Sequence, residues 1–362
     1  MILVVYTAVT VQTQSFTVKN PSQLTFEKLV SNPRYSLTLD CPCQNISIPY
    51  NSFISISPYY HQLCTSDFVL RNHLWINLIY YRSDLLDYSY DDYRRFVVPH
   101  SRLLFYLCTL ANDTLTDALF IFRSNTLISK RAQSRQAVVT QVEASIDQFR
   151  SSIPQTFMRT LDFIRQMAQG NGLVSSIGSN WYPIPLEVEK HMPMGPRSYG
   201  RSNCSCGTNP MCSTSATIDR WIVPGFLVGC YPLESLLQST LECLYNITCI
   251  NKLKKPGLVS NTTIRPLDYT VSSPNATVQS LMDALMVDRW ESSVTYESYY
   301  AACAPLSCTY VIRDRANPLY VITAIIGLFG GLNASLKLII PVFVKIVRYL
   351  IMRRRQRVDP QT

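Results

Sequence analysis

Residues 317–355 read NPLYVITAIIGLFGGLNASLKLIIPVFVKIVRYLIMRRR. No residue from Leu319 to Leu336 carries a charge. A helix that continues to Ile340 reaches the length of about 20 mostly apolar residues that a membrane-spanning helix needs. A buried helix of a soluble protein is the alternative, but core helices rarely run this long without a charge. We therefore predict a transmembrane helix over 317–340.

Basic residues dominate the end of the chain. They are Lys337, Lys345, Arg348, Arg353, Arg354, Arg355 and Arg357, against the single acid Asp359. Such an excess marks the cytoplasmic flank of a span. We expect residues 341–362 to form a basic cytoplasmic tail at the plasma membrane and residues 12–316 to form an extracellular cysteine-rich domain. The lipid bilayer is thus one expected partner.

The same basic residues supply most of the net charge of the whole chain. The formal net charge is +9, and the seven bases and one acid after Asn317 supply six of those charges. The part before the span is therefore close to neutral. Binding to nucleic acid needs a basic surface, so we expect no nucleic-acid partner.

The cysteines and five glycosylation sequons lie before the span, whereas a further sequon at Asn333 lies within it and should not be glycosylated. The twelve cysteines are Cys41, Cys43, Cys64, Cys108, Cys204, Cys206, Cys212, Cys230, Cys243, Cys249, Cys303 and Cys308. Sequons begin at Asn45, Asn112, Asn246, Asn261 and Asn275. An even number of cysteines on one side of a span is typical of disulfides in an oxidising compartment. Sequons accept glycans on the surface of a secreted domain.

The pairing of these cysteines is not determined by the sequence. Local bridges between Cys243 and Cys249 or between Cys303 and Cys308 are plausible. Cys41 or Cys43 could also join Cys64, in a loop worth about 3 kcal/mol by the chain-entropy relation.

The amino terminus, MILVVYTAVTV from Met1 to Val11, is apolar but too short to cross a membrane. It lacks the positive region that opens a signal peptide. Two interpretations remain: an atypical signal, or the outer end of a first transmembrane segment. We favour the second, because Thr10 to Ser15 offers no clear small-residue cleavage site.

The pattern of the ectodomain predicts a mainly α fold with a minor β component. Alternating apolar residues predict short strands around Ile46–Ile48 and Phe53–Ile56, limited by prolines. Ser22 is expected to cap a short helix. Further helices are expected from Leu233 onward and over 275–287, whereas residues 172–215 are predicted to be loops.

Mostly helix is predicted from Arg102 to Ala168. Apolar residues recur there in steps of three or four, at Val139, Val142, Ile146, Phe149, Ile153, Phe157, Leu161, Ile164 and Met167. Such a stripe packs against neighbouring helices or forms a coiled coil with a second subunit. Pro154 is expected to kink this helix or to open a second one. Gly170-Asn171-Gly172 should end it.

Motifs of catalysis and metal binding are absent from the sequence. No nucleophile elbow, phosphate loop, dinucleotide fingerprint or His-Glu-x-x-His motif occurs. The Cys-x-Cys pairs at 41–43 and 204–206 are spaced too closely for a usual zinc site, so disulfides are the better interpretation. We therefore expect no enzymatic activity, no metal and no cofactor.

The span itself carries small and polar residues. Gly327 and Gly331 lie four residues apart, a spacing that lets two helix backbones approach closely in lipid. Asn333 and Ser335 are polar at membrane depth, where such groups face a bundle interior or water. The segment therefore supports helix association or, in a homo-oligomer, a pore. The alternatives are ordinary glycine tolerance, and snorkelling of basic side chains with a cytosolic amphipathic extension after Pro341 that binds anionic lipid.

Three blocks carry a resemblance to known proteins. They are TLDCPCQNISIPYNSFISISPYYHQLCTSDFV (38–69), VPGFLVGCYPLESLLQSTLECLYNITCI (223–250) and YYAACAPLSCTYVI (299–312), the last followed by the span. They resemble a large, uncharacterised family of membrane proteins found mainly in rotifers. That family implies no activity, and its members open with a hydrophobic segment before the first cysteine block.

The architecture is also similar to that of the degenerin/epithelial sodium channel superfamily, which has two spans around a disulfide-rich ectodomain. Its second span carries a glycine-rich stretch and a Gly-x-Ser filter. Here the glycines are Gly327 to Gly331, and the triplet reads Asn333-Ala334-Ser335. The leading functional hypothesis is a receptor-like or interaction protein that binds an unknown extracellular partner. The alternative is a subunit of an oligomeric ligand-gated cation channel.

Overall fold

A computed structural model describes residues 11–79, 88–184, 193–255, 263–315 and 318–355. About 52 % of the chain is helical and 21 % is strand, in agreement with the predicted mainly α class. The chain forms two compact units. Unit 1 comprises Met1–Ile46, Ser129–Ser134 and Cys303–Thr362, and unit 2 comprises Ser47–Ile128 and Arg135–Ala302. The predicted first segment, apart from Val11, lies outside the described residues.

Unit 1 is built on a pair of antiparallel strands. Strand β1 (Val11–Lys19) pairs with β12 (Ser307–Arg315), and the register joins Val11 to Arg315. Helix α2 (Gln23–Ser31) follows β1. The Ser22 side chain accepts a hydrogen bond from the Thr25 backbone N–H, which confirms the predicted cap.

Unit 1 also contains the longest helix, α12 (Pro318–Arg355). Its 38 residues would measure about 57 Å at 1.5 Å per residue, longer than the roughly 30 Å hydrocarbon core of a bilayer. The helix therefore continues through Pro341 into residues that we assigned to the tail. Its candidate span, Ile325–Arg354, has a mean hydropathy of 1.7 and no buried residue in its most apolar window.

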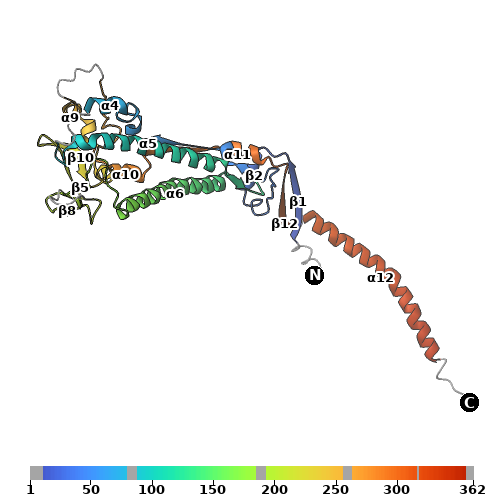
Figure 1. Cartoon of the computed structure of the whole chain (residues 1–362). Helices are drawn as coiled ribbons and strands as arrows, with labels where there is room; N and C mark the ends of the chain where they lie inside the picture. Colours follow the sequence, from blue (N-terminus) through green and yellow to red (C-terminus); the bar gives the residue numbers. More distant parts are fainter. Residues whose placement is uncertain (1–10, 80–87, 185–192, 256–262, 316–317, 356–362) are drawn as a thin grey trace, which may run out of the picture. The chain divides into compact units, whose positions relative to one another are not determined.

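Unit 2 is organised around two long helices, α5 (Tyr93–Ser124) and α6 (Arg135–Gly170). They run back along one another as an antiparallel pair (Figure 1). Phe122 of α5 lies against Phe149 of α6, with ring centroids 4.8 Å apart. Buried side chains of α5, including Phe96 and Leu115, form the centre of the core of this unit.

The remaining elements are shorter. The helices and 3₁₀ turns are η1 (Tyr50–Ser52), η2 (Gln62–Thr65), α3 (Asp67–Leu70), α4 (Asn72–Ile79), α7 (Pro232–Gln238), α8 (Glu242–Tyr245), α9 (Ile247–Leu253), α10 (Val278–Asp283) and α11 (Tyr296–Cys303). The paired strands are β2 (Ser47–Pro49) with β4 (Thr126–Ile128), β3 (Ile54–Tyr60) with β11 (Val287–Val294), β5 (Trp181–Pro183) with β6 (Met194–Pro196), β7 (Ser198–Tyr199) with β8 (Cys204–Ser205), and β9 (Ser213–Ile218) with β10 (Trp221–Gly229). All of these pairs are antiparallel.

Several predicted elements differ from the structure. The expected helix over 275–287 is wrong in extent, because Leu285 and Met286 take positive φ angles of 50° and 55° that end α10 and lead into β11. Residues 102–168 are mostly helical, as predicted, and they form parts of α5 and α6 with β4 between them. Pro154 lies inside α6 without ending it. The predicted loop 172–215 contains the short β5–β6 and β7–β8 pairs.

The apolar stripe of α6 packs mostly inside unit 2, as predicted for neighbouring helices. Val142, Ile146 and Phe149 are buried. Toward the end of the helix the stripe reaches solvent, because Ile164 is 55 % exposed and Met167 is 46 % exposed. Gly170 is the last residue of α6, and the positive φ of Gly172 (60°) turns the chain away from the helix.

Candidate functional site

All twelve cysteines are paired, and every pair lies before α12. The bridges join Cys41 to Cys308, Cys43 to Cys303, Cys64 to Cys108, Cys204 to Cys212, Cys206 to Cys230, and Cys243 to Cys249. The suggested Cys243–Cys249 bridge is confirmed. The suggestions of a Cys303–Cys308 bridge and of a bridge from Cys41 or Cys43 to Cys64 are wrong.

Backbone pairing explains the connectivity in unit 1. The backbone N–H of Asp40 donates to Thr309 O, and that of Gln44 donates to Cys303 O, both at 2.8 Å. The Cys-Pro-Cys segment therefore runs beside both Cys303 and Cys308. Two long-range disulfides result where a single local one was suggested.

Metal binding has no support in the described part of the chain. No group of three His, Cys, Asp or Glu side chains there could hold a metal ion. His61, the histidine closest to a cysteine in sequence, is buried, and its Nδ1 accepts a hydrogen bond from the Leu63 backbone N–H at 3.2 Å.

Four of the predicted glycosylation sites lie on the surface. Asn45, Asn112, Asn246 and Asn275 are exposed, and Asn261 lies outside the described residues. Asn112 is in the middle of α5, whereas Asn246 caps α9 by accepting from the Thr248 and Cys249 N–H groups. The structure therefore leaves these four positions open to solvent.

The predicted association residues of the span lie on one helix and contact no other described element. Gly327, Gly331, Asn333 and Ser335 are all exposed on α12. A Cβ built on Gly327 or Gly331 would meet no described atom within 4 Å. The Ser335 hydroxyl donates to Gly331 O at 2.8 Å, so that its hydrogen-bonding need is met within the helix.

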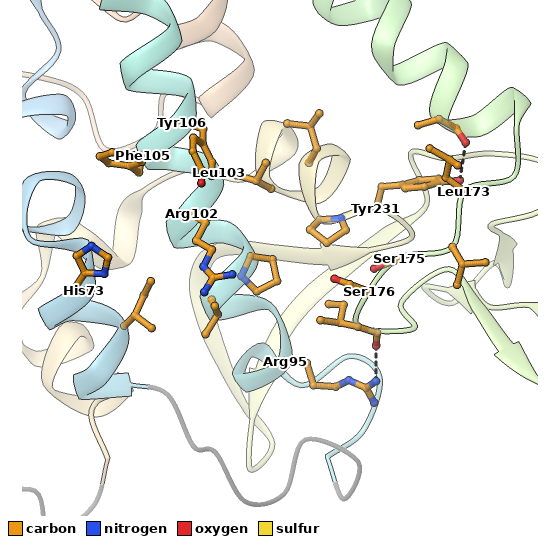
Figure 2. A pocket seen from close by; sticks show the side chains of 18 of the residues that line it. His73, Arg95, Arg102, Leu103, Phe105, Tyr106, Leu173, Ser175, Ser176 and Tyr231 are labelled. Atoms are coloured by element: carbon orange, nitrogen blue, oxygen red, sulfur yellow. Dashed lines mark hydrogen bonds between the residues drawn. The ribbon is translucent and has the colours of Figure 1, made fainter.

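A large groove lies in unit 2 beside α5, and no pattern in the sequence predicts it. We call it the α5 groove; α4, α5, the end of α6, residues 173–177 and residues 231–233 line it (Figure 2). Its volume is about 1050 Å³. Figure 2 shows Arg102 in the middle of the groove, with His73 toward one side and Ser175 and Ser176 toward the other. Helical periodicity predicts that Arg95, Arg102 and Tyr106 share one face of α5. It does not predict which residues form the opposite wall of the groove.

Hydrogen bonds hold the 173–177 wall of the groove in place. The buried Asn180 side chain accepts from the Ser175 N–H at 2.8 Å and donates to Leu173 O at 2.7 Å. Arg95 donates to Ile177 O at 2.6 Å, as Figure 2 shows. The Leu173 backbone N–H donates to Ala168 O at 3.0 Å. The wall is therefore tied to α5 and to the end of α6.

Ser179, which follows the 173–177 wall in the chain, is anchored beside a disulfide. Ser179 is buried, and its hydroxyl donates to Cys230 O at 2.8 Å, next to the Cys206–Cys230 bridge. The Tyr199 hydroxyl donates to Ser179 O at 2.7 Å. Burial raises the pKa of Tyr199 well above its usual value, so this phenol stays protonated as the donor.

No family model, curated protein or solved structure matches the chain. The resemblance to the rotifer family and to the degenerin/epithelial sodium channel superfamily therefore stays a prediction from the sequence blocks that carry it.

Proposed function

We propose that this chain is a membrane-anchored binding protein. Its disulfide-stabilised ectodomain faces the outside of the cell and recognises an extracellular partner, without catalysis. The observation that carries the proposal is the division of the chain: every cysteine is oxidised and lies before α12, whereas α12 exposes apolar side chains in all directions. Disulfides persist in oxidising compartments, and a helix with an apolar surface on all sides belongs in lipid.

The strand register of unit 1 supports the same topology. Because Val11 pairs with Arg315, the start of β1 and the end of β12 lie at one edge of the sheet. Helix α12 begins three residues after Arg315, a reach of at most about 11 Å. Both ends of the ectodomain therefore lie near the helix that we place in the membrane. Such an arrangement suits a chain that meets the bilayer at either end.

The binding role rests on the α5 groove. Its walls are anchored by hydrogen bonds and a disulfide, and it is open to solvent with apolar and cationic side chains. A concave surface of this kind, with a few convergent polar groups, is the usual form of a ligand site.

The topology is tested in sealed microsomes that contain the full-length chain with a carboxyl-terminal epitope tag. We expect added protease to remove the tag and to leave a protected, glycosidase-sensitive ectodomain fragment. Detergent should expose that fragment to the protease. A protected tag together with a degraded ectodomain would overturn the proposal.

A second candidate, a subunit of an oligomeric ligand-gated cation channel, is favoured by the exposed polar side chains of α12. Asn333 and Lys337 are both exposed on α12. In lipid such groups are stabilised by a bundle interior or by water. Whole-cell recording from cells that express the full-length chain tests this role. No current above background, together with a monomer on a native gel, would exclude it.

A further inference from the structure

We propose that the α5 groove binds a single-chain amphiphile with a negatively charged head, that is, a fatty-acid-like carboxylate. This inference deepens the binding role of the ectodomain proposed above and rests on it. The charge of the groove, its exposed apolar side chains and its size each point to this ligand.

The charge of the groove is positive. Arg95 and Arg102 line it, and no described lining residue is an aspartate or a glutamate. Arg102 is exposed and makes no hydrogen bond or ion pair within the described part of the chain. An anionic head group would provide the charge-assisted hydrogen bonds that a guanidinium forms with carboxylates.

Arg95 adds to this charge from a half-buried position. Its guanidinium donates to two carbonyls, Tyr88 O at 3.2 Å and Ile177 O at 2.6 Å, and to no described carboxylate. Burial, and then the nearby positive charge of Arg197, lowers the pKa of Arg95, although the nearby Asp92 acts in the opposite direction. Carbonyl groups stabilise a cation less well than a carboxylate does, so the base of the groove favours an anion.

The rest of the lining favours an apolar body behind that head. Tyr106 is 56 % exposed, Leu173 is 55 % exposed and Val174 is 56 % exposed. Leu103 and Phe105 lie beside them and are partly buried. Large apolar side chains gathered in one concave surface mark a binding site, because covering them removes apolar area from water.

The size of the groove selects a small ligand. Small-molecule sites measure roughly 300–1,000 Å³, and the α5 groove lies just above that range with about 1050 Å³. The bonds from Asn180 to Leu173 and Ser175 fix the wall before a ligand arrives. A wall fixed in this way loses little conformational entropy on binding.

Photo-crosslinking tests the proposal on the full-length chain in lipid nanodiscs. A diazirine-bearing fatty acid is irradiated with the protein, and labelled peptides are mapped by mass spectrometry. The matched probe is a diazirine-bearing fatty amine of the same chain length. We expect the acid to label the peptides around Leu103–Tyr106 and Leu173–Val174 at least five-fold more than the amine. Both probes should label α12, which reports membrane insertion independently of the groove.

Two matched pairs of substitutions sharpen the test. Arg102→Gln should reduce acid labelling of the groove several-fold, whereas Arg159→Gln, an exposed arginine of α6 outside the groove, should leave it unchanged. Val174→Ser should also reduce labelling, in contrast to Phe163→Ser, which removes an exposed apolar side chain outside the groove. Equal labelling by acid and amine, or equal effects of Arg102→Gln and Arg159→Gln, would overturn the proposal. Failure of α12 labelling alone would instead contradict the membrane anchor.

Discussion

Arg165 and Glu234 form a bidentate ion pair that joins α6 to α7. Arg165 Nε and Nη2 each lie 2.6 Å from a Glu234 carboxylate oxygen, Oε1 and Oε2 respectively. Glu234 is buried, with a side chain only 6 % exposed. Hydrogen bonding to Glu234 raises the pKa of Arg165 despite its partial burial. Pro232 and Leu233 precede Glu234 and line the α5 groove, so this pair fixes that part of the lining to α6.

Removing the charge of Glu234 should destabilise unit 2. Glu234→Gln keeps the shape of the side chain but leaves the Arg165 guanidinium without its buried partner. Breaking a buried ion pair from one side costs about 3 kcal/mol. Denaturant unfolding of the full-length chain measures the loss. The control is Asp162→Asn, because Asp162 also contacts Arg165, at 2.7 Å, but is 51 % exposed and should cost less than about 1 kcal/mol. Equal losses for the two variants would contradict the expectation.

Acid should weaken the ectodomain through His100. This side chain is buried among Tyr93, Phe96 and Phe226, and burial lowers its pKa to about 3. Below pH 6.5 the unfolded chain therefore binds a proton that the folded chain does not, so stability falls as the pH drops from 6.5 toward 3. Between about pH 7.5 and 5.5 the loss is about 1.4 kcal/mol.

Replacement of His100 tests this pH dependence. His100→Gln removes the titrating group, so the loss of stability between about pH 7.5 and 5.5 should shrink by about 1.4 kcal/mol. Burial also lowers the pKa of His61, and the part of the slope that His61 causes should remain. His73→Gln is the control, because His73 is exposed. A slope that is unchanged in His100→Gln would contradict the assignment.

The two disulfides of unit 1 should act cooperatively. Cys41–Cys308 and Cys43–Cys303 each close a long loop, with sequence separations of 267 and 260. While one of them is intact, the other closes only a short loop. By the chain-entropy relation, replacing either pair with serine should cost about 2–3 kcal/mol, and replacing both should cost about 8 kcal/mol. Unfolding of the three variants measures this difference, and strictly additive losses would contradict it.

These disulfides also show where sequence reasoning stops. The sequence predicts that the cysteines are oxidised, because all of them lie before the apolar helix. It does not predict that Cys303 and Cys308 both reach the Cys-Pro-Cys segment, since this depends on the pairing of β12 with the chain near Asp40. A local loop is the default assumption when only the separation along the chain is known.

The α5 groove could not be predicted from the sequence for a similar reason. Helical periodicity predicts the buried face of α6, and the Ser22 cap and the Gly170 stop follow from local signals. The wall opposite α5, residues 173–177, instead depends on the buried Asn180 and on Arg95, whose partner Ile177 lies 82 residues away in the sequence. A hydrogen bond between distant residues leaves no periodic signal, so sequence patterns do not reveal the groove.

Glycosylation of Asn246 should be separable from its structural role. The Asn246 side-chain oxygen caps α9 by accepting from the Thr248 N–H at 2.8 Å, and a glycan would attach to the nitrogen instead. Asn246→Gln should therefore remove one glycan and also cost about 1 kcal/mol through the lost cap. Asn275→Gln should remove a glycan with little effect on stability. Glycosidase-sensitive gel shifts and thermal unfolding measure the two effects, and an equal loss of stability would contradict the capping role.

Helix association is tested on the glycine face of α12. Because a Cβ at Gly327 or Gly331 meets no described atom within 4 Å, leucine at these positions fits the monomer without a clash. Any loss of self-association in the Gly327→Leu/Gly331→Leu variant would then arise between subunits, because the leucine side chains block the close approach of two helix backbones. We expect self-association in lipid to weaken at least ten-fold, or about 1.4 kcal/mol, as measured by energy transfer between labelled chains. Phe329→Leu is the control, because Phe329 is two residues from both glycines and therefore lies about 160° around the helix from each of them. If the control and the double variant weaken association equally, the glycine face is not the interface.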